Sequence, residues 1–166
     1  MGNKPIITLR KTCATDMVYV HKWLLQKDML KNFPMTDVRE IEDSIRVWKL
    51  YLNKGSSITA LYKKKPCGAA LLYINDFEKI KHHTLFVIIV DEKMRNKKVG
   101  TLLIKELFHL AQEEFNIELI HLEVYENNPA YHLYKRLGFK EYGCHPKFLK
   151  DEKGVYFSKI LMQKEL

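Results

Sequence analysis

The stretch Leu85–Leu103, LFVIIVDEKMRNKKVGTLL, decides the fold because it joins an apolar strand, a basic loop and the start of an amphipathic helix. Four of the six residues from Lys93 to Lys98 are basic. A helix N-terminus has unpaired N–H groups and a partial positive charge, so acidic residues are normally favoured there over basic ones. A bound phosphate or pyrophosphate would remove the conflict, because N–H groups, helix dipole and side chains would all face one anion. The stretch therefore predicts an anion site.

The composition is that of a globular domain. Hydrophobic residues make up 46% of the 166 residues and charged residues 29%, which allows a core without disulfides or metals. We therefore expect one domain over residues 1–166. The net charge of +8 permits nucleic acid, an acidic membrane surface or a phosphorylated small ligand as partner, and charge alone does not choose among them. No metal site is expected, because the three cysteines, Cys13, Cys67 and Cys144, are far apart and lack zinc-type spacing.

The sequence contains no predicted membrane segment. The N-terminal residues MGNKPIITLRK include no apolar run of signal-peptide length, and no segment has the roughly 20 apolar residues that cross a bilayer. We expect a cytoplasmic protein that does not bind membranes.

The N-terminal half is predicted as a strand, two helices and three strands. The first helix should begin at a cap on Thr15 or Asp16 and run to Asn32, and the second should begin at Asp37, where Glu40 completes a capping box. The third of the later strands is nearly continuous in apolar residues, as in a strand buried on both faces. The expected ranges are 6–10, 15–32, 37–53, 57–62, 67–74 and 84–90.

The C-terminal half is predicted as helix, strand, helix and two strands. The apolar stripe of the helix after the basic loop stops near Asn116, and the short helix has Asn128 as its cap and Gly138 at its end. The expected strands are 117–125, 139–144 and 155–162. This order predicts an α/β fold with a mixed sheet, helices on both faces and a ligand site at the carboxyl end of the strand before the basic loop.

The basic loop contains neither GxxxxGK[ST] nor GxGxxG. Its residues Arg95–Gly100, RNKKVG, instead resemble Arg/Gln-x-x-Gly-x-Gly/Ala, the pyrophosphate loop of the GNAT superfamily of acyl-CoA N-acyltransferases. The first and last defined positions match, and Lys98 stands at the middle glycine. Taken alone, the match also fits a solvated basic loop.

A second and more specific match lies downstream, in Asn127–Phe139, NNPAYHLYKRLGF. This segment resembles the family's Asn-x-x-Ala-x-x-x-Tyr-x-x-x-Gly-Phe at every defined position. A capped surface helix explains Pro129 and Gly138, but it does not explain Asn127, Tyr134 and Phe139 at those offsets. Both motifs and the element order are similar to the family over essentially the whole chain, nearest the branch of ribosomal-protein and spermidine N-acetyltransferases.

The resemblance implies a GNAT fold with a splayed strand pair and a bound acetyl-CoA. The main chain before the basic loop would pair with pantetheine, the N–H groups of the loop would hold the pyrophosphate, and Asn127 would bind the pantetheine arm. The Lys98 side chain either points outward or adds an ion pair to a phosphate, and we favour the ion pair. The residues implied in cofactor binding are Ile88, Ile89, Val90, Arg95, Asn96, Lys97, Lys98, Val99, Gly100, Thr101, Asn127 and Tyr134.

The reaction implied is direct attack of a primary amine on the thioester, with Tyr134 as the general acid for the leaving thiolate. The amine must first lose a proton, and Glu123 is the candidate base because it lies on the polar face of the strand entering the cleft. Related enzymes carry a glutamate in a similar stretch, but here its spacing to Asn127 is one residue short, so an ordered water chain remains an alternative. His83 and His121 are either proton relays or ordinary surface histidines.

The acceptor expected from the resemblance is a small amine, such as a polyamine, amino sugar or antibiotic, or a protein N-terminus. The basic charge disfavours a free polycation, because a protein of charge +8 repels it at long range. The competing hypothesis is a non-catalytic module that binds CoA or nucleic acid, although no basic helix or aromatic platform for nucleic acid is evident. We expect a monomer or a homodimer.

Overall fold

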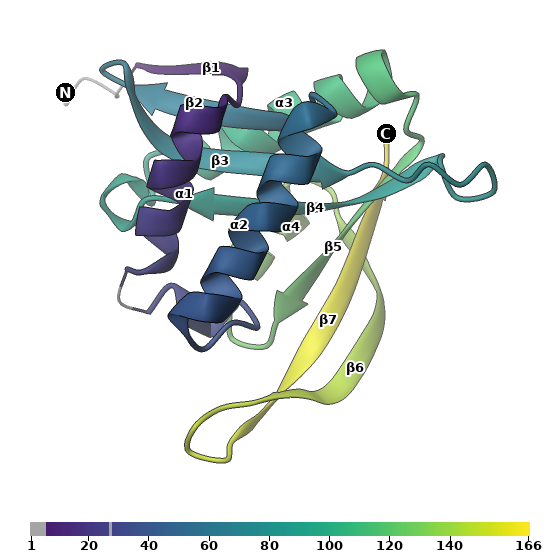
Figure 1. Cartoon of the computed structure of the whole chain (residues 1–166). Coiled ribbons are helices and arrows are strands. Elements are labelled where there is room, and N and C mark those ends of the chain that lie inside the picture. Colours follow the sequence, from purple (N-terminus) through teal and green to yellow (C-terminus); the bar gives the residue numbers. More distant parts are fainter. Residues whose placement is uncertain (1–5, 27) are drawn as a thin grey trace, which may run out of the picture.

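A seven-stranded mixed sheet forms the centre of the computed structural model, which describes residues 6–26 and 28–166 (Figure 1). The strand order is β1-β2-β3-β4-β5-β7-β6. The β4–β5 pair is parallel and the other neighbours are antiparallel. The strands are β1 Ile7–Lys11, β2 Ser57–Tyr62, β3 Lys65–Tyr73, β4 His83–Val90, β5 Leu119–Tyr125, β6 Lys140–Lys150 and β7 Tyr156–Glu165. The predicted mixed α/β sheet is confirmed.

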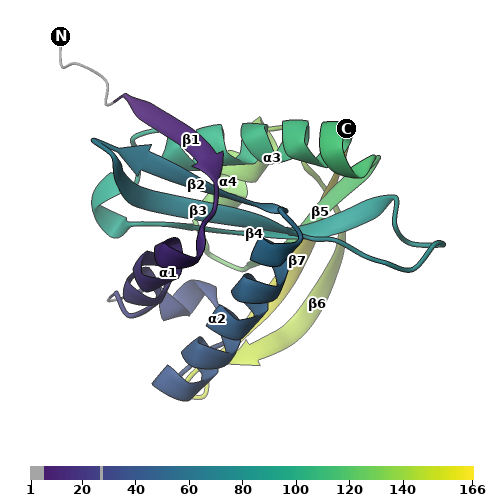
Figure 2. The same cartoon turned by 45° about the horizontal axis from the view of Figure 1, so that its top comes forward.

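Helices cover both faces of this sheet, as predicted. Figure 2 shows α3 along one face and α1 and α2 against the other. The helices are α1 Met17–Leu24, α2 Val38–Asn53, α3 Val99–Phe115 and α4 Ala130–Arg136, with 3-10 turns at Ala14–Asp16, Leu30–Asn32 and Glu92–Met94.

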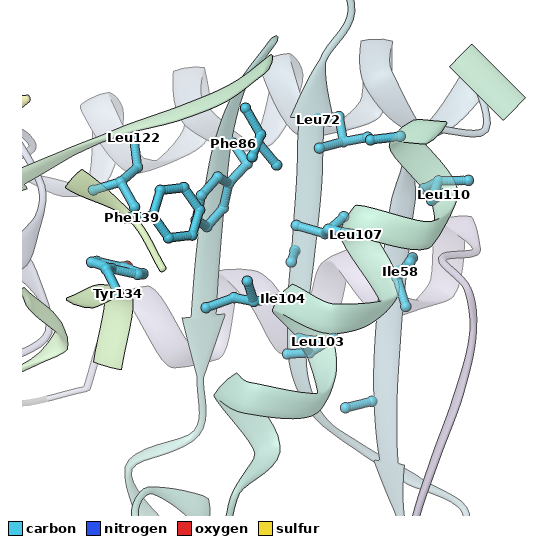
Figure 3. Packing of buried hydrophobic residues seen from close by; sticks show 14 of the residues in the cluster. Ile58, Leu72, Phe86, Leu103, Ile104, Leu107, Leu110, Leu122, Tyr134 and Phe139 are labelled. Atoms are coloured by element: carbon cyan, nitrogen blue, oxygen red, sulfur yellow. The ribbon is translucent and has the colours of Figure 1, made fainter. Parts of the chain in front are cut away.

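Each face of the sheet has its own buried cluster. On the α3 face, Leu103 and Leu107 of α3 belong to the same cluster as Ile58 and Leu72 of the sheet (Figure 3). The other cluster combines α1 and α2 with the opposite face of β3 and β4, and its members include Trp23, Ile41, Trp48, Leu71 and Ile89. Because β3 and β4 contribute to both clusters, their side chains are buried alternately on either side, which explains their nearly continuous apolar sequence.

The prediction of one helix through Asn32 is wrong. Helix α1 ends at Leu24, and Leu30–Asn32 is a separate 3-10 turn. Between them, the Gln26 side chain donates to Asp91 Oδ1 at 3.0 Å and accepts from the Glu92 N–H at 3.1 Å. These bonds to the loop after β4 span 65 residues or more of sequence, so no local pattern shows them.

The start of α2 follows its predicted cap. Asp37 Oδ1 accepts from the Glu40 N–H at 2.9 Å. The Glu40 carboxylate, however, accepts from the Thr36 N–H and hydroxyl, so the reciprocal half of the box is shifted by one residue. The observed register places α2 so that Ile41 and Trp48 are buried.

The final hairpin is longer than predicted. Strands β6 and β7 extend well beyond the expected 139–144 and 155–162, and the hairpin projects from the rest of the chain in Figure 1. Their register shifts between Glu141 and Gly143 and again between His145 and Leu149. Such irregularities bend a strand and re-aim its side chains, which hides its period in the sequence.

Within residues 6–26 and 28–166, no helix combines the length and hydropathy of a membrane span. The same residues contain no cluster of three or more side chains arranged to hold a metal. The first five residues of the N-terminal segment, on which the expected location partly depends, lie outside the described residues.

Candidate functional site

Strands β4 and β5 separate after a short parallel contact. Their pairing is limited to His83 with Leu119, Thr84 with Ile120, and Leu85 with His121. Beyond Leu85, β4 continues against β3 as far as Val90, and β5 continues against β7. The edge of β4 that faces β5 therefore has no strand partner from Phe86 onward. The predicted splayed pair is present.

A pocket of about 460 Å³ lies at this separation. Phe86, Ile88 and Val90 line it from the α3 side of the sheet, and Val87 and Ile89 line it from the α1–α2 side. The 3-10 turn after α1, the basic loop, β5 and α4 complete the wall. The pocket is thus lined by side chains from both faces of the sheet.

The basic loop and the first turn of α3 line one part of this pocket. Arg95, Asn96 and Lys98–Thr101 all contribute to the wall. Lys98 is the N-cap of α3 and has φ +66°, a left-handed conformation in which glycine is favoured. The first N–H groups of α3 have no intrahelical partners, so they are available to an anion in the pocket. The family's glycine at this position thus has a conformational reason, and Lys98 adopts the same backbone conformation.

Among residues 6–26 and 28–166, three cations line the pocket wall. Besides Arg95 and Lys98, which were predicted, the wall includes Arg136 at the end of α4. The Arg95 guanidinium donates to Met29 Sδ at 3.4 Å, which links the basic loop to the segment after α1. Sequence reasoning missed Arg136, although its position two residues after Tyr134 on a short helix was a usable signal.

Tyr134 lies in the same pocket and is only 7% exposed. Its ring packs edge-on against Phe86 and Phe139, each with centroids 5.9 Å apart (Figure 3). Burial raises the pKa of Tyr134 far above its ordinary value. Among the described residues, none accepts a hydrogen bond from its hydroxyl. The phenol is therefore kept protonated, with a hydroxyl available to a ligand.

Glu123 lies on the pocket wall and is paired with a lysine. Its Oε2 accepts from Lys159 Nζ of β7 at 2.9 Å. The Lys159 side chain is 12% exposed and its ammonium lies 3.7 Å from the centre of the Phe148 ring. The sequence did not predict the contact between Glu123 and Lys159, because these residues are 36 positions apart and meet only through the β5–β7 register.

Two predicted residues, Asn127 and Lys97, lie outside the pocket lining. Asn127 is exposed, with φ +67°, whereas Asn128 lines the pocket. The N-cap of α4 is Pro129 rather than the predicted Asn128, whose Oδ1 accepts from the Ala130 N–H at 2.9 Å. Lys97 also lies outside the lining, and its ammonium donates to the Lys93 carbonyl at 2.8 Å.

The two histidines form a pair outside the pocket lining. His83 Nδ1 and His121 Nε2 are 3.3 Å apart, at the end of the β4–β5 ladder. Burial, together with the neighbouring His83, lowers the pKa of His121. The pair is therefore adjacent to the splay but does not face the pocket.

Comparisons with known proteins agree with this geometry. The sequence model described as "Acetyltransferase (GNAT) family" matches residues 18–139. An N-alpha-acetyltransferase from Sulfurisphaera tokodaii is 34% identical over 77 residues, which cover 46% of this chain and 46% of that protein, so the match spans less than half of the relative.

Two solved structures share the fold over nearly their whole length. The ribosomal-protein-alanine N-acetyltransferase from Brucella melitensis superposes with a TM-score of 0.79 at 20% identity, covering 96% of this chain and 99% of that one. The protein yncA from Salmonella typhimurium, solved with its cofactor acetyl-CoA, superposes with a TM-score of 0.82 at 15% identity, covering 97% and 94%. Because the family match includes most of the sequence and the fold agrees, the chain belongs to the acetyltransferase (GNAT) family.

Proposed function

We propose that this protein is an acyl-CoA-dependent N-acetyltransferase that moves an acetyl group from acetyl-CoA to a primary amine. One observation carries the proposal: a pocket at the β4–β5 separation is bordered by a basic helix N-terminus and contains a buried phenol. Membership of the GNAT family supports the same activity.

The donor would bind along the loop and the free edge of β4. The N–H groups of residues 96–101 suit the pyrophosphate, whereas that of Arg95 already donates to the Glu92 carbonyl. The side chains of Arg95, Lys98 and Arg136 supply charge for the phosphates. The main chain of Ile88–Val90 has no partner on its β5 side and so can pair with the amide groups of pantetheine. Asn127 remains a proposed contact for that arm, and the lining residue Asn128 is the alternative.

In the proposed reaction the amine attacks the thioester directly, and the side chains of the protein transfer the protons. The amine nitrogen forms a bond to the thioester carbonyl carbon, the C–S bond breaks, and Tyr134 donates its proton to the departing sulfur. The amine proton goes to Glu123 or to a water chain. Deprotonation at neutral pH costs roughly 4 to 5 kcal/mol for a lysine-like amine and about 1 kcal/mol for an α-amine, so weakly basic acceptors need the least help.

The acceptor class is suggested by the relatives' names. The curated relative is an N-alpha-acetyltransferase, and one structural neighbour is named for the alanine of a ribosomal protein. These names favour the α-amine of a protein N-terminus over a polyamine, amino sugar or antibiotic. The cytoplasmic location and the monomeric or homodimeric state stay predictions.

The test is a thiol-release screen with acetyl-CoA against peptide N-termini, polyamines, amino sugars and aminoglycosides. Release above the acceptor-free background, with the acetylated product identified by mass, is the expected result. Tight acetyl-CoA binding without release for any acceptor would instead indicate a CoA-binding module. Salt-sensitive nucleic-acid binding without thioester cleavage would indicate the nucleic-acid hypothesis.

A further inference from the structure

On the α1–α2 side of the sheet, the pocket wall includes Glu123, one member of a charged pair. Glu123 belongs to the residues of β5 whose side chains alternate away from buried Leu122 and Val124. The basic loop and α4 line the pocket beside the α3 face, so the acyl donor fills that side and the acceptor has to approach from the Glu123 side. The carboxylate of Glu123 is therefore an anionic group of the pocket wall on the acceptor side.

Among the described residues, Lys159 makes the one ion pair of this carboxylate. Lys159 stands opposite Tyr125 in the β5–β7 ladder, one diagonal step from Glu123, and reaches it at 2.9 Å. The Glu123 side chain is 44% exposed, whereas that of Lys159 is only 12% exposed. The cation is thus the more deeply held partner.

An aromatic group holds the ammonium in place. Phe148 covers Lys159 at 3.7 Å and stacks on Tyr125 with centroids 6.1 Å apart. Phe148 lies where β6 and β7 lose their register between His145 and Leu149, so the irregularity places this ring over the neighbouring strand. A carboxylate beside an aromatic ring is a typical site for an organic cation, and here the chain's own lysine fills it.

We propose that Lys159 is a specificity-determining residue, which neutralises Glu123 and so selects weakly basic acceptors, such as a peptide α-amine, over strongly basic or multiply charged amines. The inference rests on the proposed function and deepens it. With Lys159 in place, an arriving ammonium gains little from Glu123, and a polyamine is also repelled by a like charge.

Weakly basic amines do not need a free carboxylate. At pH 7 about one α-amine in ten is neutral, against about one lysine-like amine in 2,500. The nearby cation lowers the basicity of a bound amine further. The paired site therefore suits an acceptor that already loses its proton near neutral pH.

The test compares kcat/KM for a peptide with a free α-amine and for spermidine, by thiol release, in the wild type and in Lys159→Met. Removal of the ammonium leaves Glu123 free, so the spermidine-to-peptide ratio should rise about tenfold, the factor that one pKa unit represents. Lys159→Arg keeps the charge and should keep the wild-type ratio. If the methionine variant does not fold, Lys159→Gln serves the same comparison.

The matched control is Lys164→Met. Lys164 is on the same strand but stands opposite Ile120, and its ammonium lies near the Phe108 ring, so its loss removes the same charge without touching the Glu123–Lys159 pair. An unchanged ratio in folded Lys159→Met, or an equal rise in Lys164→Met, would overturn the inference. Absence of thiol release by the wild type with every acceptor would remove the proposed function, and this inference with it. The double variant Lys159→Met/Glu123→Gln should lose the raised spermidine-to-peptide ratio of Lys159→Met. That loss would support the freed Glu123 carboxylate as the cause of the raised ratio.

Discussion

The ring of Tyr134 is buried, and its hydroxyl donates a hydrogen bond to none of the described residues. If this phenol protonates the departing sulfur, Tyr134→Phe should lower kcat by about 10²- to 10⁴-fold, the usual contribution of general acid catalysis. The dissociation constant for acetyl-CoA should change by no more than about threefold, because the ring and its packing against Phe86 and Phe139 are retained. Thiol release and calorimetric titration measure the two quantities.

Tyr131→Phe is the matched control for this substitution. It removes a hydroxyl from the same helix, but the Tyr131 hydroxyl donates to Glu141 rather than facing the pocket. It should leave kcat within about twofold. Unchanged turnover in Tyr134→Phe would remove the role assigned to Tyr134.

Asp16 is predicted to make a large contribution to the free energy of unfolding. It is 2% exposed and accepts hydrogen bonds from Arg10, the Cys13 N–H and Thr59. Asp16→Asn leaves the Arg10 guanidinium without its carboxylate partner and should lower the free energy of unfolding by about 2–4 kcal/mol, at the lower end because Arg10 is partly exposed. Urea unfolding at pH 7 measures the loss.

The same variant should show a defined pH dependence. Burial alone would raise the pKa of Asp16, but the hydrogen bonds from Arg10, Cys13 and Thr59 outweigh it, so the pKa lies below its usual range. The ionised Asp16 stabilises the fold fully at any pH above its pKa in the unfolded chain, about 3.9. This stabilisation is lost as the pH falls through the lower pKa of Asp16 in the folded protein. The gap between wild type and Asp16→Asn should therefore shrink below about pH 4. Asp43→Asn, which breaks only the exposed pair with Arg46, should cost less than about 1 kcal/mol.

At the scale of elements, the start of α3 places a strained lysine where the family pattern has glycine. Lys98→Gly relieves the positive φ, offset by greater chain entropy, so the free energy of unfolding should rise by up to about 1 kcal/mol. The same change removes a cation from the pocket wall and should weaken acetyl-CoA binding by about tenfold, most strongly at low salt. Thermal unfolding and titration at two salt concentrations test both effects.

Lys64→Gly is the matched control for Lys98→Gly, because it removes the same charge and likewise relieves the positive φ of a lysine. Lys64 has φ +65°, nearly that of Lys98, but it lies in the turn between β2 and β3 and does not line the pocket. It should show the stability gain without the loss of affinity. Equal or tighter binding by Lys98→Gly would show that the Lys98 side chain points outward, which is the alternative left open by the sequence.

Elements with local signals were predicted well, and those held by distant contacts were not. The stripe of α3 ends at Asn116, and Asp37 caps α2, because both signals lie within a turn of the residues concerned. The break after Leu24 and the Glu123–Lys159 pair depend on side chains from other elements, so sequence spacing carries no trace of them. Motif and helix coincide at Tyr134, which lines the pocket, whereas the loop conformation at Asn127 places that residue outside the lining.

At the scale of the whole molecule, the sheet consists of two parts joined by little strand pairing. Strands β1 to β4 form one ladder and β5 to β7 another, and only three residue pairs connect β4 with β5. A ligand that pairs with the free edge of β4 and contacts β5 would add the missing connection. Acetyl-CoA at 100 times its dissociation constant should therefore stabilise the fold by about 2.7 kcal/mol and raise Tm by roughly 5–10 °C.

Hydrogen exchange distinguishes this connection from binding at the basic loop alone. Acetyl-CoA should slow exchange of the amides of Ile88 and Val90, which face the β5 side of β4 and have no strand partner there, as well as those of Val99–Thr101. Adenosine 3′,5′-bisphosphate has phosphates but no pantetheine arm, so it should protect only the α3 start and raise Tm by less. Equal protection of the Ile88 and Val90 amides by both ligands, or by neither, would contradict the pairing of pantetheine with β4. Protection by acetyl-CoA alone would show that the cofactor joins the two parts of the sheet through its arm, where the chain itself leaves them apart.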